Sequence, residues 1–198
     1  MNTGTRDRNF VLAGVGGQGT LLVSNVLAHV GVRAGYDVKK AEVHGMAQRG
    51  GSVSSHIRWG AKIHSPLIGL GEADYLVAFE VLEALRYVEL LRPGGTVIVG
   101  EMRIPPLSVS SGGDVYPDDE TVRRILGQAT EDLSFVPSVR LAKDAGNVRA
   151  HNIVLLGALS VHLDQVPLEV WLEVIGEWVP KRYLEVNVNA FRMGREAY

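Results

Sequence analysis

A short apolar run that leads into a glycine-rich loop constrains the fold of this chain more than any other feature. Phe10-Val11-Leu12-Ala13 is followed directly by Gly14-Val15-Gly16-Gly17-Gln18-Gly19. Apolar side chains then recur at helical spacing over residues 21–30. The pattern predicts a strand, a tight glycine loop and a helix. In that arrangement glycine allows a ligand to approach the backbone closely, and the helix N-terminus attracts an anion.

Strand-like and helix-like segments alternate along the rest of the chain. Alternating or continuous apolar runs predict further strands at 36–43, 52–59, 75–79, 96–99 and 134–136. Amphipathic spacing predicts further helices at 81–91, 119–130, 147–162, 168–179 and 184–195. We therefore expect a single three-layer α/β domain, flavodoxin-like or Rossmann-like, with a largely parallel sheet flanked by helices and a helical C-terminal third. It would span residues 9–198, after a disordered N-terminus at 1–8.

The composition excludes several classes of function. The chain contains no cysteine, so it forms no disulfide and ligates neither a thiolate-bound zinc ion nor a Cys-bound iron–sulfur cluster. Its 20 Lys+Arg nearly balance its 22 Asp+Glu, which leaves no net field to steer nucleic acid or a membrane surface. The sequence also lacks a spanning apolar stretch, a secretory signal and a His spacing typical of metal sites. We expect a cytoplasmic protein that binds no metal, nucleic acid or membrane.

The residues alone leave three interpretations of the glycine loop open. It binds a phosphate or another anion, it belongs to a dinucleotide site, or it is a tight turn without a ligand. Glu42 follows Gly19 by 23 residues, close to the spacing of the acidic residue in dinucleotide sites, but Gln18 stands where such loops carry a small or apolar residue. In the polar segment after Glu42, Arg49 suits either a carboxylate or phosphate ligand or an ordinary surface ion pair.

Two segments taken together resemble a known family. They are Gly-Val-Gly-Gly-Gln-Gly-Thr at 14–20 and Glu-Val-His-Gly-Met-Ala-Gln-Arg-Gly-Gly-Ser-Val at 42–53. Over about residues 9–195 the chain is similar to the beta subunit of indolepyruvate:ferredoxin oxidoreductases. More broadly it resembles the gamma subunit of pyruvate and other 2-oxoacid:ferredoxin oxidoreductases. Shorter matches occur at 65–68, 71–74, 79–80, 83–86 and 152–158.

The resemblance implies oxidative decarboxylation of a 2-oxoacid, in particular indolepyruvate or an arylpyruvate, to an acyl-CoA with electron transfer to ferredoxin. Thiamine diphosphate, Mg²⁺ and the iron–sulfur clusters would lie on a larger partner chain, since this chain has neither cysteine nor the diphosphate–magnesium motif. This subunit would be inactive alone and would reach ferredoxin only through the complex. When isolated, it would form a homo-oligomer or expose an apolar patch. The alternative is a stand-alone NAD(P)-binding oxidoreductase.

The resemblance also implies a set of site residues. This subunit would help to hold coenzyme A as co-substrate or to close the active site, without binding any other cofactor by itself. No catalytic residue and no metal ligand is assigned to it. The expected cofactor-binding residues are Gly16, Gly17, Gln18, Gly19, His44, Gln48 and Arg49.

Overall fold

Six strands form one sheet in a computed structural model that describes residues 7–44 and 51–198. The strands are β1 (Arg8–Val15), β2 (Asp37–His44), β3 (Ser52–Gly60), β4 (Ala73–Ala78), β5 (Leu91–Gly100) and β6 (Leu133–Val136). Their spatial order is β2-β3-β1-β4-β5-β6. β1, β4, β5 and β6 are parallel neighbours, whereas β3 runs antiparallel to both β1 and β2. The sheet is therefore mostly parallel, with an antiparallel strand inserted beside β1.

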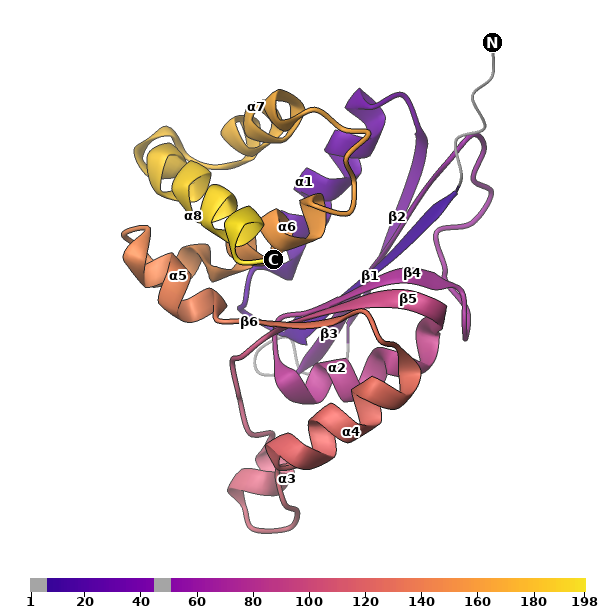
Figure 1. Cartoon of the computed structure of the whole chain (residues 1–198), viewed down its shortest axis with the longest axis vertical. Coiled ribbons are helices and arrows are strands. Elements are labelled where there is room, and N and C mark those ends of the chain that lie inside the picture. Colours follow the sequence, from indigo (N-terminus) through magenta and orange to yellow (C-terminus); the bar gives the residue numbers. More distant parts are fainter. Residues whose placement is uncertain (1–6, 45–50) are drawn as a thin grey trace.

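Helices cover both faces of the sheet and produce three layers (Figure 1). One face carries α2 (Val81–Tyr87) and α4 (Asp119–Ala129). The opposite face carries α1 (Thr20–Arg33), α5 (Ser138–Asp144), α6 (His151–Ser160), α7 (Leu168–Trp178) and α8 (Leu184–Glu196). The short α3 (Leu107–Ser110) lies in an excursion that projects away from the sheet (Figure 1). The three-layer α/β fold and the helical C-terminal third predicted from the sequence are confirmed.

The central strands supply both hydrophobic cores because successive side chains point to opposite faces. In β1, Phe10 and Leu12 face the core under α1 and α6, while Val11 and Ala13 face the core under α2 and α4. All four side chains are fully buried. This two-sided burial explains why β1 is a continuous apolar run rather than an alternating one.

Several predicted boundaries are wrong. The predicted helix 81–91 ends at Tyr87, because a 3₁₀ turn follows and the chain enters β5 at Leu91 instead of residue 96. The predicted helix 147–162 divides into a 3₁₀ turn at Val148–Ala150 and α6. Neither α3 nor α5 was expected, because helices of 4 and 7 residues are too short to show a clear helical period.

The N-terminal boundary also shifts. Arg8 is the first residue of β1, where it is paired with Trp59, so it does not belong to a disordered segment at 1–8. Residues 1–6 of that predicted segment lie outside the described residues. β1 therefore begins one residue before the predicted start of the domain at residue 9.

Two glycines allow α6 to be buried on every side. All ten residues of α6 are buried. A Cβ atom on Gly157 would overlap the carbonyl oxygen of Phe191 in α8, and one on Gly194 would overlap the carbonyl oxygen of Val154 in α6. The two helices thus touch backbone to backbone, an approach that only glycine permits.

We predict that Gly194→Ala lowers the free energy of unfolding by about 1–3 kcal/mol, because the added methyl group forces α6 and α8 apart. The matched control is Gly127→Ala at an exposed position in the last turn of α4, where a Cβ would meet no other part of the described structure within 4 Å. That substitution should raise stability by about 0.5–1 kcal/mol, since alanine favours the helix. Urea unfolding of both variants measures the difference, and equal stabilities would contradict the backbone contact.

Candidate functional site

A cavity of about 630 Å³ lies beside the glycine loop. The loop follows the carboxyl end of β1, and the other walls come from the segment after β5 and from the start of α6. Open α/β sheets bind their ligands at this carboxyl edge. We call this cavity the glycine-loop pocket. Its lining residues are Gly16, Gly17, Gln18, Gly19, Met102, Ile104, Val148, Arg149, His151 and Asn152.

The glycine loop is held against the start of α6. Gly17 and Gly19 have φ angles of 105° and 82°, in the left-handed region that favours glycine. The side chain of Asn152 donates a hydrogen bond from Nδ2 to the carbonyl oxygen of Gly19 (3.2 Å). A Cβ atom on Gly19 would overlap this amide, so any other residue there would displace the Asn152 side chain as well as strain the loop.

Gln18 fastens the loop to the protein's own backbone. Its side chain is 6% exposed. Oε1 accepts a hydrogen bond from the backbone N–H of Val15 (2.7 Å), and Nε2 donates one to the carbonyl oxygen of Phe79 (3.0 Å). Gln18 lines the pocket, but both ends of its amide already have protein partners. The loop therefore offers a ligand main-chain N–H groups rather than this side chain.

The positive ends of two helices meet at the pocket. α1 begins immediately after Gly19, and α6 begins at His151. Within the described part of the chain, the N–H groups of Thr20, Leu21 and Leu22 donate to no acceptor. A helix N-terminus carries roughly half a positive charge, and the exposed Arg149 at the rim adds a full one. The pocket is electropositive and suits an anionic group.

His151 forms a buried wall of the same pocket. The residue is 6% exposed, and its Nδ1 is buried without a hydrogen-bond partner among residues 7–44 and 51–198. Burial lowers the pKa of the imidazole below its ordinary value, so His151 is neutral at pH 7. It contributes an uncharged, polar surface to the pocket.

Sequence reasoning missed half of the residues that line the pocket. Three of them belong to the start of α6 and the turn before it, and two follow β5, far from the glycine loop along the chain. Short turns of this kind lack the periodic pattern that marks an element. Asn152 was the exception, since it belonged to the family resemblance. The missed residues are Met102, Ile104, Val148, Arg149 and His151.

The second predicted loop lies mostly outside the described residues. Gln48 and Arg49 fall in the undescribed range 45–50, and of His44 only the backbone at the end of β2 is described. Gly51 is the first described residue after this range. Its carbonyl oxygen accepts a hydrogen bond from the N–H of Gly16 (2.9 Å). The end of the second loop thus lies directly against the glycine loop, as a joint site would require. The ligand-binding roles of all seven residues stay predictions.

The position of Glu42 removes the geometric basis of a dinucleotide site. In such sites the strand carrying the acidic residue lies next to the glycine-loop strand. Here β3 separates β2 from β1, which moves the end of β2 to roughly 10 Å from β1 instead of about 5 Å. The Glu42 carboxylate also forms an ion pair with Lys40 (2.7 Å).

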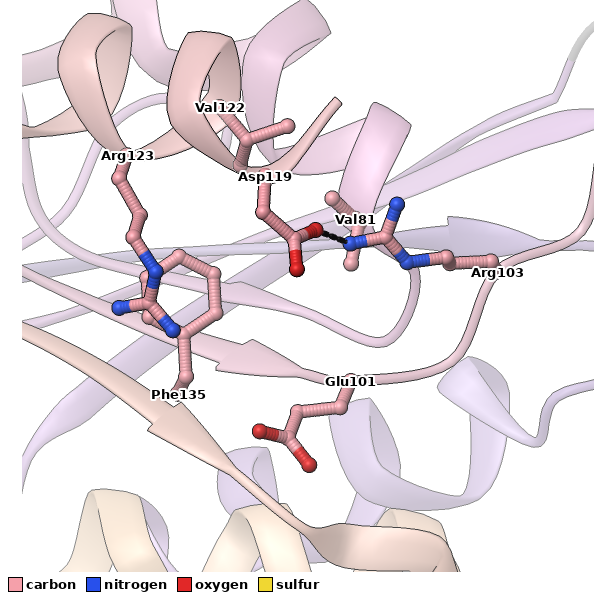
Figure 2. A pocket seen from close by; sticks show the side chains of 7 residues that line it. All are labelled: Val81, Glu101, Arg103, Asp119, Val122, Arg123 and Phe135. Carbon is pink, nitrogen blue, oxygen red and sulfur yellow. Dashed lines mark hydrogen bonds and ion pairs between the residues drawn. The ribbon is translucent and has the colours of Figure 1, made fainter. Parts of the chain in front are cut away.

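A smaller cavity of about 180 Å³ lies on the other side of the segment after β5. Met102 and Ile104 face the glycine-loop pocket, whereas Glu101 and Arg103 line this second cavity. Figure 2 shows Arg103 paired with Asp119 and the Arg123 guanidinium stacked on the ring of Phe135. Charges of both signs surround the cavity, so it lacks the electropositive character of the glycine-loop pocket.

The fold and the pocket define a three-layer α/β domain in which a glycine loop and two helix N-termini face one cavity. This chain belongs to the pyruvate ferredoxin/flavodoxin oxidoreductase family, whose sequence pattern matches residues 9–197. It is 41% identical to the indolepyruvate oxidoreductase subunit IorB of Pyrococcus horikoshii over 196 residues, which cover 97% of this chain and 96% of that protein. The predicted family is confirmed, and the chain is of the small-subunit type of 2-oxoacid:ferredoxin oxidoreductases.

Solved structures share the fold. Pyruvate oxidoreductase subunit PORC of Thermotoga maritima has a TM-score of 0.73 at 23% identity, covering 98% of this chain and 97% of that one. The 2-oxoglutarate:ferredoxin oxidoreductase of Magnetococcus marinus has a TM-score of 0.72 at 23% identity. The match covers 98% of this chain but only 31% of the other, so there the fold is one part of a longer polypeptide.

The described residues contain neither a membrane-spanning helix nor a cluster of metal ligands. No helix in residues 7–44 and 51–198 is long and apolar enough to cross a membrane. In the same part of the chain, no three His, Asp or Glu side chains are grouped so that they could hold a metal ion.

We predict that His151 makes the folded state less stable as the pH falls. Because its folded pKa lies below its unfolded pKa, the unfolded chain binds a proton that the folded chain does not. From about pH 7 to pH 5, the free energy of unfolding of the wild type should fall more steeply than that of His151→Gln, by up to about 1.4 kcal/mol per pH unit. Urea unfolding at several pH values measures both slopes. His29→Gln, at an exposed position of α1, is the control. Parallel curves for wild type and His151→Gln would refute the prediction.

Proposed function

We propose that this chain is the small subunit of an indolepyruvate-type 2-oxoacid:ferredoxin oxidoreductase and that its glycine-loop pocket holds coenzyme A. The complex would oxidatively decarboxylate indolepyruvate or another arylpyruvate to the acyl-CoA and pass the electrons to ferredoxin. The name of the relative with 41% identity over nearly the full length supports the substrate class. The observation that carries the ligand proposal is the convergence of two helix N-termini and Arg149 on one cavity.

The residues of the pocket fit a ligand such as coenzyme A, which carries phosphates at one end and a mostly uncharged arm at the other. The free N–H groups at the start of α1 and the guanidinium of Arg149 would hold a phosphate. Met102, Ile104 and Val148 would contact an uncharged part of the molecule and exclude water from it. Coenzyme A supplies the thiol that receives the acyl group.

The partner chain would supply the remaining chemistry. Without cysteine this subunit cannot ligate an iron–sulfur cluster through thiolates. Thiamine diphosphate, Mg²⁺ and the clusters would therefore be held by the larger subunit, and ferredoxin would dock on the complex. The proposed contribution of this chain is to bind and orient the co-substrate. Its cytoplasmic location stays a prediction from the sequence.

No observation favours the stand-alone NAD(P)-binding alternative, because β3 separates Glu42 from the glycine-loop strand. A role of the glycine loop as a contact for the larger subunit, without a small ligand, is the competing outcome of the binding experiment below.

We predict that Arg149→Ala weakens coenzyme A binding about 10- to 100-fold. The reason is that it removes one charge-assisted hydrogen bond, which contributes about 1.5–3 kcal/mol. Isothermal titration of the intact chain measures the affinity, and thermal melting checks that the fold is retained. Arg140→Ala, which removes an exposed arginine of α5 outside this pocket, should leave the affinity unchanged.

Two further variants test the loops themselves. Gly17→Val should also weaken coenzyme A binding, because its side chain would occupy space that no described atom fills and its φ of 105° disfavours a β-branched residue. Arg49→Ala should weaken it as well if the second loop contributes to the site. If Arg149→Ala, Gly17→Val and Arg49→Ala all leave the affinity for coenzyme A unchanged, the glycine loop serves only as a contact for the larger subunit.

We also predict that the isolated chain oxidises no 2-oxoacid and that activity appears only with a cysteine-rich, thiamine-binding partner. Reduction of ferredoxin with indolepyruvate and coenzyme A, measured with and without the co-purified partner, tests this dependence. Light scattering of the isolated chain tests the expected homo-oligomer, since subunits of permanent complexes expose apolar interfaces when they are separated. Activity of the pure chain alone would overturn the assignment as an accessory subunit.

A further inference from the structure

The junction between β4 and α2 is hydrogen-bonded to two opposite walls of the glycine-loop pocket. The carbonyl oxygen of Phe79 accepts a bond from Nε2 of Gln18 in the glycine loop (3.0 Å). The N–H of Val81 donates to the carbonyl oxygen of Met102 in the wall after β5 (3.1 Å). The residue between Phe79 and Val81 is Glu80.

The Glu80 carboxylate binds three separate parts of the chain. The residue is 1% exposed. Oε1 accepts hydrogen bonds from the N–H of Ile104 (2.9 Å) and from the hydroxyl of Tyr116, while Oε2 accepts one from the N–H of Glu83 (3.0 Å) at the start of α2. Among the described residues it forms no ion pair, so N–H and O–H donors alone compensate its burial.

Two of these bonds fix the root of the excursion at 101–118. Ile104 lies at its start and lines the pocket, and Tyr116 lies near its end. The Tyr116 oxygen also accepts a bond from the N–H of Leu82 (3.2 Å), which places it directly over the start of α2. Burial raises the pKa of the Tyr116 phenol, so the hydroxyl keeps the proton that it donates to Glu80.

We propose that Glu80 is a positioning residue that sets the separation of the pocket walls by holding Ile104 and the root of the excursion against the β4–α2 junction. A carboxylate is needed because its two oxygens accept from different directions at once. A glutamine has a single acceptor oxygen and must lose either the α2 cap or the bond to Ile104. The consequence for coenzyme A rests on the proposed function, whereas the position of the walls does not.

The competing explanation is that Glu80 only caps α2. The chain offers a matched control, because Asp118 caps α4 in the same manner by accepting a bond from the N–H of Thr121 (2.8 Å). Asp118 lines neither the glycine-loop pocket nor the smaller cavity beside it. Glu80→Gln and Asp118→Asn therefore both remove a negative charge from a helix N-terminus, but only Glu80→Gln should move the pocket wall.

The first readout needs no ligand. The chain has four methionines, so the ¹³C-methyl signal of Met102 can be assigned with Met102→Leu. Its sulfur lies 3.0 Å from Nε2 of Gln18, so its methyl group reports how the wall after β5 sits against the glycine loop. Glu80→Gln should shift the Met102 methyl signal and accelerate hydrogen exchange of the Ile104 amide at least about tenfold. Asp118→Asn should leave both unchanged.

The second readout is the steady-state kinetics of the reconstituted complex. Glu80→Gln should raise the KM for coenzyme A in the reconstituted complex about tenfold with little change in kcat, while Asp118→Asn should change neither. If Glu80→Gln does not fold, Tyr116→Phe is the substitute variant, because it removes one donor to the carboxylate and should move the Met102 signal in the same direction.

The outcomes separate the two proposals. Unchanged Met102 and Ile104 signals in both Glu80→Gln and Tyr116→Phe, or equal changes in Asp118→Asn, overturn the positioning role. A Met102 signal that shifts in Glu80→Gln but does not respond to coenzyme A in the wild type supports the positioning role and overturns the coenzyme A assignment. If Glu80→Gln changes the Met102 and Ile104 signals but not the KM for coenzyme A, Glu80 positions the walls without affecting coenzyme A binding, and the functional consequence is overturned.

Discussion

The rest of the site depends on the hydrogen bonds that join the carboxyl end of β1 to the carboxyl end of β4. The N–H of Phe79 donates to the carbonyl oxygen of Ala13 (2.8 Å), and the Gln18 amide then bridges from the Phe79 carbonyl oxygen back to Val15. These bonds determine where β1 stops and where the loop turns. They thereby set the start of α1, which begins directly after Gly19 of the pocket lining. A glycine loop without this bridge would leave the backbone of Val15 and Phe79 unsatisfied in a buried place.

The positive character of the pocket comes mainly from backbone dipoles rather than from side-chain charge. The chain as a whole is close to neutral, with a formal net charge of −2. Two helix N-termini and one arginine nevertheless produce a local positive potential in one cavity. Backbone N–H groups are fixed by the fold, so they require no reorganisation when an anion arrives. The composition of a chain therefore gives little indication of the charge of such a site.

Part of this architecture could be predicted from the sequence and part could not. The glycine loop was predictable, because the apolar period changes from strand to helix on either side of it. The insertion of β3 between β1 and β2 was not, because local periodicity does not encode which strands become neighbours. Gln18 was recognised as unusual for a dinucleotide loop, but its role as a clamp depends on Phe79, which is distant in sequence. Arg149 and His151 lie at a turn and a helix start without a periodic signal.

The contact between α6 and α8 has a consequence for the order in which the molecule is completed. α6 is buried on every side, yet α8, one of the helices that cover it, follows it by more than twenty residues along the chain. During synthesis the sheet and α1 emerge before the glycine face of α6 has its partner. Until Gly194 and its neighbours have left the ribosome, that apolar helix has an uncovered side. Packing of α6 is thus complete only after α8 has been made and has docked, and the interval before α8 docks is the period in which chaperone binding would protect the chain most.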